Sequence, residues 1–416
     1  MSEEGAGETT RVKRQKIDDS DSFFRDFLKK EIERELLEEA YTSLCRGSSD
    51  MVFRILKVMQ TNALLSEGFS RASCKVKMYE KERTDKKPLA RLYAAGSIFK
   101  NGIYILKKFL APNPEVPVDG EQREALRKLL NFLLQDHDSA LLESEKCDEA
   151  QWAVRVAQHL LLPLTVADSY TIDDYYDGLK KILPQCPCKT GERINGSLGD
   201  TSFGWIDGWH GRSDILVNSV AVDLAYPDMP ADDDLEVCSS VSSSVSSTEV
   251  KASSNFNEKD QQQVLAQTIV FSFLQRKENK LKGNLKHCLV PGIGISKKKA
   301  VIYSYDCDED VLLGSTQMDL FGYKSICYNT IVVLWLALNY KIFGTGITES
   351  MKNYKAEFFN RVGSFLENYR NDVTRTLCKK HKRSDEDTGW TKNGAVEDKI
   401  AVNADNEDLG IKMKRL

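Results

Sequence analysis

The chain has 416 residues, 41% of them hydrophobic, and a formal net charge of −4. This length is enough for two domains with a sizeable core. The longest apolar run near the C-terminus, residues 330–340, is shorter than the roughly 20 residues that a membrane-spanning helix needs, which excludes a spanning helix there. The acidic net charge excludes strong attraction to nucleic acid by bulk charge alone.

The first part of the chain is predicted to be a helical domain, residues 20–165, behind a disordered tail, residues 1–19. Apolar residues recur at helical spacing in five segments: residues 21–46, 50–65, 94–110, 121–137 and 148–162. The two prolines within residues 111–114 should end the third of these helices. Leucine and aromatic stripes of this kind are typical of core-facing surfaces rather than of ligand sites.

Residues 166–383 have a mixed pattern. Helices are expected at 173–183, 259–276, 326–343 and 352–380, and strands at 204–206, 214–217, 220–226, 289–295, 300–305 and 311–313. Residues 227–247, acidic and then serine-rich, predict a disordered insert, and residues 384–416 predict a solvated tail. The expected fold class is therefore α+β, with an N-terminal helical domain followed by an α/β core whose small mixed sheet is flanked by helices.

The cysteines and the N-terminal residues give indications of the cellular location of the protein. Ten cysteines are scattered without framework spacing, and the chain opens with polar and charged residues rather than a secretory signal, which favours reduced thiols in an intracellular protein. The pair Cys186 and Cys188 lacks a second Cys or His pair at zinc-finger spacing, so these thiols are expected to be structural. The basic cluster at residues 11–16 resembles a short nuclear-localisation signal and favours a nuclear location, and a second basic cluster lies at residues 379–383. Either cluster could instead be a solvated tail or a patch that contacts phosphate.

Three charged side chains form the pattern that most clearly indicates a catalytic site. Asp214 opens an apolar strand, and Glu249 and Lys251 form a Glu-x-Lys element. Residues i and i+2 of a strand point to the same face, so Glu249 and Lys251 would face one site, with the carbonyl of Val250 between them. Carboxylate and carbonyl oxygens suit Mg²⁺ or Mn²⁺, which would lower the pKa of a bound water that Lys251 could position.

This arrangement resembles the PD-(D/E)xK nuclease superfamily. The matching positions are Gly211 and Asp214 in a Gly-x-x-Asp element, Glu249 and Lys251, and a glutamine on the following helix, either Gln263 or Gln267. The resemblance covers residues 200–340, in the order strand, strand, helix, and Ser213 stands where the family usually has proline.

The resemblance implies a restriction-endonuclease-like core that hydrolyses nucleic-acid phosphodiesters, with DNA as the expected substrate. It places Asp214, Glu249, Lys251 and a glutamine in the catalytic site. Superfamily members often have a further acid on a helix before the first core strand, and Glu149 is the candidate here. His210 and Arg212, just before Asp214, are expected to contact the scissile phosphate.

A competing carboxylate lies closer to Asp214 in the sequence. Residues 220–226 form a better strand pattern than residues 247–251, and Asn218 and Ser219 could make a hairpin turn that sets Asp223 opposite Asp214. The position two after Asp223 is Ala225, which cannot replace a lysine. Glu249 and Lys251 are therefore preferred, with the acidic insert looping out of the sheet at little entropic cost.

Three functional hypotheses follow. The first is a metal-dependent nuclease. The second keeps the nuclease fold without the chemistry, as a module that binds DNA or protein. The third is a helical interaction protein with a phosphorylatable acidic linker, which predicts that Asp214, Glu249 and Lys251 lie far apart. The pattern leaves the choice of DNA or RNA and the oligomeric state open.

Overall fold

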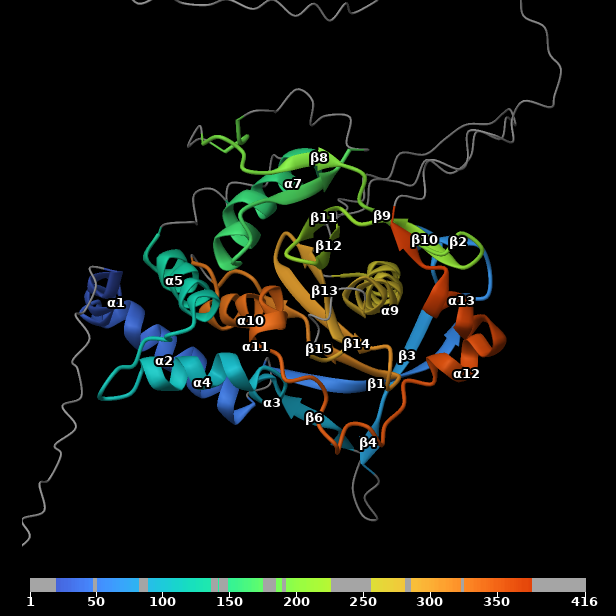
Figure 1. The fold of residues 1–416 in the computed structure, drawn as a ribbon, viewed down its shortest axis with the longest axis horizontal. Coiled ribbons are helices and arrows are strands. Elements are labelled where there is room, and N and C mark those ends of the chain that lie inside the picture. Colours follow the sequence, from blue (N-terminus) through green and yellow to red (C-terminus); the bar gives the residue numbers. More distant parts are fainter. Residues whose placement is uncertain are drawn as a thin grey trace, which may run out of the picture. The chain divides into compact units, whose positions relative to one another are not determined.

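The computed structural model describes residues 20–47, 51–81, 89–135, 141, 149–174, 185–188, 192–225, 256–280, 286–322 and 325–375. All of these residues fall within one compact unit, and their fold is mixed α+β around a large mixed sheet (Figure 1). The predicted insert and both predicted tails lie outside the described residues. Within the described ranges, no helix combines the length and the apolar character needed to cross a bilayer.

The large sheet has the strand order β3-β1-β15-β14-β13-β12-β11-β7-β8, with β6 paired to β1 and β16 to β14. Two neighbouring pairs, β12 with β13 and β7 with β8, are parallel. The strands are β1 (Val52–Thr61), β3 (Cys74–Met78), β6 (Leu92–Ala94), β7 (Tyr170–Asp173), β8 (Ser197–Gly199), β11 (Ile215–Val217), β12 (Val220–Ala225), β13 (Leu289–Ser296), β14 (Lys299–Asp306), β15 (Val311–Ser315) and β16 (Met318–Asp319). Strand β13 is buried along its whole length, as expected of a strand covered on both faces.

Helix α9 (Glu258–Lys280) lies between the large sheet and a smaller one. The smaller sheet has the order β17 (Thr374–Arg375), β9 (Ser202–Gly204), β10 (Trp209–Arg212) and β2 (Glu67–Gly68). The helix packs on β13 and β14 and also contacts β9 and β10 (Figure 1). Its central residues, from Val264 to Gln275, are all buried, because a helix covered on several sides has no need of a polar face.

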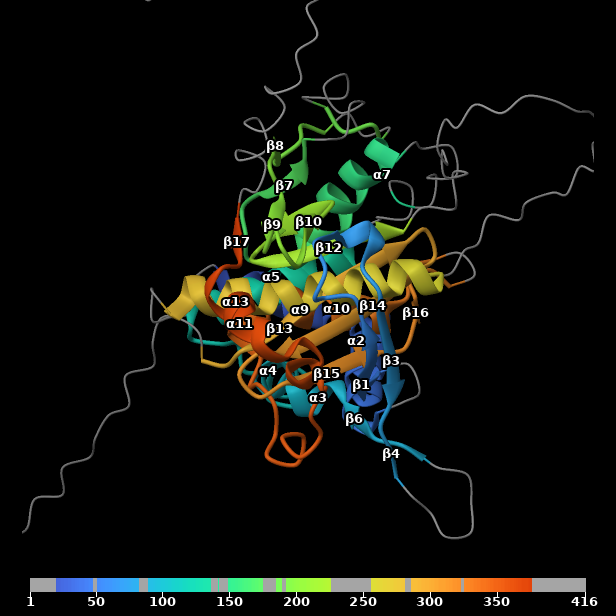
Figure 2. The same cartoon turned by 90° about the vertical axis from the view of Figure 1, so that its right-hand side faces the viewer.

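The remaining helices lie on both sides of the large sheet. Helices α2 (Glu31–Arg46), α4 (Lys100–Phe109), α5 (Gly120–Leu134) and α10 (Tyr328–Leu338) are on the side opposite α9, and α12 (Phe358–Val362) and α13 (Leu366–Asn371) are on the side of α9 (Figure 1; Figure 2). Helix α10 is buried from Thr330 to Leu338 and packs on α2 and α5. The indole nitrogen of Trp335 donates a hydrogen bond of 2.8 Å to the carbonyl of Ala125.

The shorter elements complete the chain. They are α1 (Ser20–Leu28), α3 (Ala95–Ile98), α7 (Glu149–Val156), α11 (Tyr340–Phe343), β4 (Glu80–Lys81), β5 (Leu89–Ala90), the 3₁₀ turns η1 (Phe69–Arg71), η4 (Leu162–Leu164) and η5 (Gly363–Phe365), and the π-helical turn η3 (Ala157–Leu161) that continues α7.

Most of the sequence predictions for elements are confirmed. Helices occur at α4, α5, α7 and α9, and strands at β11 to β15. The predicted turn between β11 and β12 is present, with φ values of 47° at Asn218 and 62° at Ser219. Two positive φ values in succession suit a tight hairpin turn.

Three predictions were wrong. Strand β1 (Val52–Thr61) lies where a helix was expected over residues 50–65, and β1 pairs with β15, so residues 20–165 are not a purely helical region and share the sheet with the C-terminal half. The helix expected at 21–46 divides into α1 and α2 around Lys29 and Lys30. The helix expected at 352–380 is interrupted at Gly363, where φ is 52°. Most of the helix expected at 173–183 lies outside the described residues.

Candidate carboxylate site at strands β11 and β12

Asp214 lies in the bend that leads into β11. Its backbone carbonyl accepts a hydrogen bond of 3.0 Å from the amide of Asp173. This bond extends the antiparallel pairing of β11 with β7 by one residue. Its carboxylate oxygen Oδ2 accepts a hydrogen bond of 2.6 Å from the amide of Leu224 on β12. The hairpin pairing therefore turns the Asp214 carboxylate toward β12.

Asp223 is the carboxylate that the hairpin brings next to Asp214. Its Oδ1 accepts a hydrogen bond of 3.4 Å from the Asp214 amide. The residue is 3% exposed, because β12 is an inner strand between β11 and β13. Its Oδ2 is buried and has no hydrogen-bond partner among the described residues, an arrangement that is costly for a carboxylate unless a proton or a cation compensates it.

Burial raises the pKa of Asp223 well above its ordinary value, and the negative charge of Asp214 raises it further. Hydrogen bonds from Asp214 and Ser213 oppose this rise in the pKa without cancelling it. The charge of Asp260, on the first turn of α9, adds to it. Carboxylates this close repel one another when both are ionised, so a cation would be favoured beside them.

Gln267 positions the backbone that leads to Asp214. Its side-chain amide donates a hydrogen bond of 3.1 Å to the carbonyl of Arg212, and the residue is 2% exposed. Gln263, one helical turn earlier on α9, is partly exposed. Of the two glutamines expected to support the site, Gln267 is thus joined by a hydrogen bond to the segment that bears Asp214.

The backbone conformation at Gly211 and its close neighbour Phe69 both favour glycine at this position. Its φ is 144°, and a Cβ atom at this position would lie 3.0 Å from Cδ2 of Phe69. Both features disfavour a larger residue. The glycine of the Gly-x-x-Asp element thus supports the approach of β10 to the turn at Phe69 and is not itself a ligand.

Arg212 is surrounded by acidic side chains. Its guanidinium lies 2.5 Å from Asp173 and 2.6 Å from Asp174, and Asp200 is 3.9 Å away. These carboxylates already balance the positive charge of Arg212, which was expected to contact the scissile phosphate. Contact between Arg212 and a phosphate stays a prediction.

The other expected site residues are not brought to Asp214 by any described contact. Glu249, Val250 and Lys251 lie outside the described residues. Glu149 is the first residue of α7. His210 is on β10, where its Nδ1 lies 3.0 Å from the carbonyl of Gly208. The alternative pairing with Asp223 was visible in the strand pattern, but the lack of a lysine at Ala225 weighed against it.

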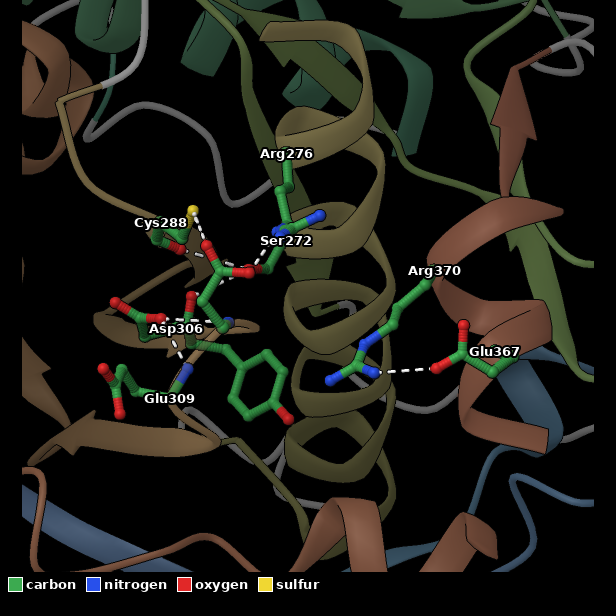
Figure 3. Close-up of polar contacts among 9 residues, drawn as sticks. Ser272, Arg276, Cys288, Asp306, Glu309, Glu367 and Arg370 are labelled. Carbon is green, nitrogen blue, oxygen red and sulfur yellow. Dashed lines mark hydrogen bonds and ion pairs between the residues drawn. The ribbon is translucent and has the colours of Figure 1, made fainter. Parts of the chain in front are cut away.

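A second polar cluster surrounds the turn between β14 and β15 (Figure 3). The Cys288 thiol donates a hydrogen bond of 2.9 Å to Asp308, which also forms an ion pair with Arg276. A hydrogen bond to Cys307, together with burial, raises the pKa of the Cys288 thiol. A thiol is a poor nucleophile compared with its thiolate, and Asp308 already has a cationic partner, so this cluster is best explained as support for the turn.

Comparisons with family models, with curated proteins and with solved structures found no match to this chain. Function is therefore inferred from the geometry around Asp214, Asp223 and Gln267.

Proposed function

We propose that this protein is a divalent-metal-dependent nuclease of the PD-(D/E)xK type, with Asp214 and Asp223 as its paired carboxylates. The single observation that carries the proposal is the buried Asp223 carboxylate beside Asp214, with one oxygen that has no partner among the described residues. An oxygen of this kind fits a metal ligand, because Mg²⁺ and Mn²⁺ prefer carboxylate oxygens.

The order of elements supports the same proposal. Strand β11, strand β12 and helix α9 follow one another in the order that the resemblance implies, and α7 with its first residue Glu149 precedes them. Strand β13, which follows α9, is parallel to β12. A restriction-endonuclease-like core formed by these elements is part of the proposal.

Each residue has a distinct role in this proposal. Asp214 and Asp223 bind Mg²⁺ or Mn²⁺, which supplies a water of lowered pKa and stabilises charge on the phosphate. Gln267 positions the backbone before Asp214 through the Arg212 carbonyl. Since Ala225 takes the place of the family's lysine on β12, Lys251 remains the proposed residue for orienting the water, and Glu249 remains a proposed additional acid.

Cleavage assays on the full chain test the proposal. Purified protein with Mg²⁺ or Mn²⁺ should cleave DNA, and parallel reactions with RNA determine the substrate. Asp214→Asn and Asp223→Asn should each lower the rate by about 100-fold or more, because loss of a metal ligand removes several kcal/mol of transition-state stabilisation. Asp319→Asn, at a carboxylate that pairs with Lys299 on the surface, is the matched control and should cleave normally.

The outcomes separate the roles. Unchanged cleavage by both Asp214→Asn and Asp223→Asn would overturn the proposal. If Lys251→Ala abolishes cleavage while Glu249→Ala does not, Lys251 supplies the lysine and Asp223 is the second carboxylate. Loss of activity in Glu249→Ala with Asp223→Asn still active would restore Glu249 as the second carboxylate.

A second candidate function is supported by a different observation. Ala225 occupies the lysine position, and the Leu224 amide already bonds Asp214, which favours a nuclease fold without catalysis that binds DNA or protein. Calorimetric titration separates the two functions. Absence of cleavage, together with Mg²⁺ and Mn²⁺ affinities no higher than those of Asp214→Asn, would favour the binding module.

A further inference from the structure

Three metal-ligating side chains meet in the interior, outside the carboxylate site. They are His159 in the π-helical turn after α7, and Cys186 and Cys188 in the short described segment that follows β7. The Nε2 atom of His159 lies 3.2 Å from the Cys186 sulfur and 3.0 Å from the Cys188 sulfur. Their ligating atoms all lie within 4.8 Å of one another, and all three residues are buried.

The backbone around the cluster directs these atoms toward one point. The Cys186 amide donates a hydrogen bond of 2.8 Å to the Glu192 carbonyl, and Gln185 and Arg193 form an antiparallel β-bridge, so the segment that bears the two cysteines lies beside residues 192–193. Arg155, one helical turn before His159, donates a hydrogen bond of 2.9 Å to the Pro187 carbonyl between the cysteines. π-helical turns occur frequently at functional sites.

We propose that His159, Cys186 and Cys188 bind one Zn²⁺ ion. Two sulfurs and one imidazole nitrogen within 4.8 Å of one another match the preference of zinc for thiolate and imidazole ligands. A water molecule would complete the tetrahedral shell. Such a site would join residues 185–188 to the turn at the end of α7.

The outer environment of His159 agrees with this assignment. Its Nδ1 atom, which points away from the sulfurs, lies 3.9 Å from a carboxylate oxygen of Glu192. A zinc-bound histidine commonly directs its second nitrogen to a carboxylate, which orients the ring. Next to His159, Gln158 accepts hydrogen bonds from the Tyr170 hydroxyl at 3.0 Å and from the Asn195 amide at 3.1 Å. These two hydrogen bonds tie the helical turn that presents the imidazole to β7 and to the segment at Asn195.

Metal analysis of the full chain tests the proposal. Protein purified under reducing conditions should contain one zinc per chain, and X-ray absorption should show two sulfur ligands near 2.3 Å and at least one nitrogen near 2.0 Å, roughly the usual zinc distances. Replacement of zinc by Co²⁺ should give thiolate-to-metal charge-transfer absorption. His159→Gln and the double variant Cys186→Ser, Cys188→Ser should lose the zinc.

The matched control is Cys74→Ser, which changes a buried thiol on β3, outside the cluster, and should retain zinc. Asp214→Asn should also retain it, which separates this site from the proposed nuclease site. A reduced wild-type chain that binds neither Zn²⁺ nor Co²⁺, or zinc retained by both ligand variants, would overturn the proposal. A Cys186–Cys188 disulfide in metal-free protein purified without reductant, with no zinc uptake after reduction, would do the same. If the variants fail to fold, X-ray absorption and the Co²⁺ spectrum of the wild-type protein still identify the ligands of the bound metal.

Discussion

At the scale of single residues, Asp223 is both a proposed metal ligand and a residue whose ionisation affects the stability of the fold. Its folded-state pKa is raised above the ordinary value of 3.8, so the folded state binds a proton more tightly than the unfolded state. The free energy of unfolding therefore falls as the pH rises from about 4 through the raised pKa. Above that pKa, the folded protein must hold a buried negative charge that the unfolded chain exposes to water.

Asp223→Asn should remove this pH-dependent loss. In buffer without Mg²⁺ or Mn²⁺, the variant should be more stable than the wild type at pH 8 and close to it at pH 4, as measured by thermal unfolding. Asp310, whose pKa burial raises to about 6, is present in both proteins, so its contribution cancels in the comparison. A variant that is less stable than the wild type at pH 8 would show that the Asp223 charge is compensated by a group other than a divalent metal.

At the scale of elements, packing between α4 and its neighbours α10 and α11 depends on Gly102. A Cβ atom there would lie 2.3 Å from Cδ2 of Leu336 and 3.1 Å from Cγ of Phe343. Gly102→Ala should therefore destabilise the fold by about 1–3 kcal/mol, the usual cost of overpacking, although alanine favours helix by about 1 kcal/mol. Urea unfolding measures the difference.

The matched control is Gly120→Ala at the start of α5, where a Cβ atom would meet nothing within 4 Å. This variant should be as stable as the wild type or more stable by up to about 0.5 kcal/mol, since only helix propensity changes. Equal effects of the two substitutions would contradict the tight packing of α4 on α10 and α11.

At the scale of the whole molecule, β1 joins the two halves of the chain. It pairs with β15 on one side and with β3 on the other, and Phe53, Ile55 and Val58 are buried. A fragment of residues 166–383 would expose an unpaired sheet edge and apolar surface at β15. We expect this fragment to lack a cooperative urea transition, whereas residues 20–377 should unfold in one. A fragment that unfolds cooperatively would restore residues 166–383 as an independent domain.

Local signals were sufficient for several elements. Helix α5 was predicted from its leucine spacing, and the structure adds the Asp119 side chain as its N-cap, which accepts a hydrogen bond of 2.9 Å from the Gln122 amide. The β11–β12 hairpin was predicted from alternating apolar residues around Asn218 and Ser219. Such signals act over a few neighbouring residues, so the sequence displays them directly.

Strand β1 shows where local reasoning fails. From Val52 to Val58, buried residues lie on both faces of the strand, so polar residues do not alternate regularly with apolar ones. A short apolar run of this kind suits a buried strand as well as a helix. Pairing with β15, more than 250 residues away in the chain, decides between them.

The sequence by itself determined the mixed α+β class, the order of β11, β12 and α9, and the set of carboxylates from which a metal site could be built. Only the tertiary structure decided that Asp223 lies beside Asp214 with a buried oxygen, and that His159 meets two cysteines 27 and 29 positions later. The physical reason is that hydrogen bonding and periodicity within an element are local. Burial, and the meeting of side chains from different elements, depend on how the whole chain packs.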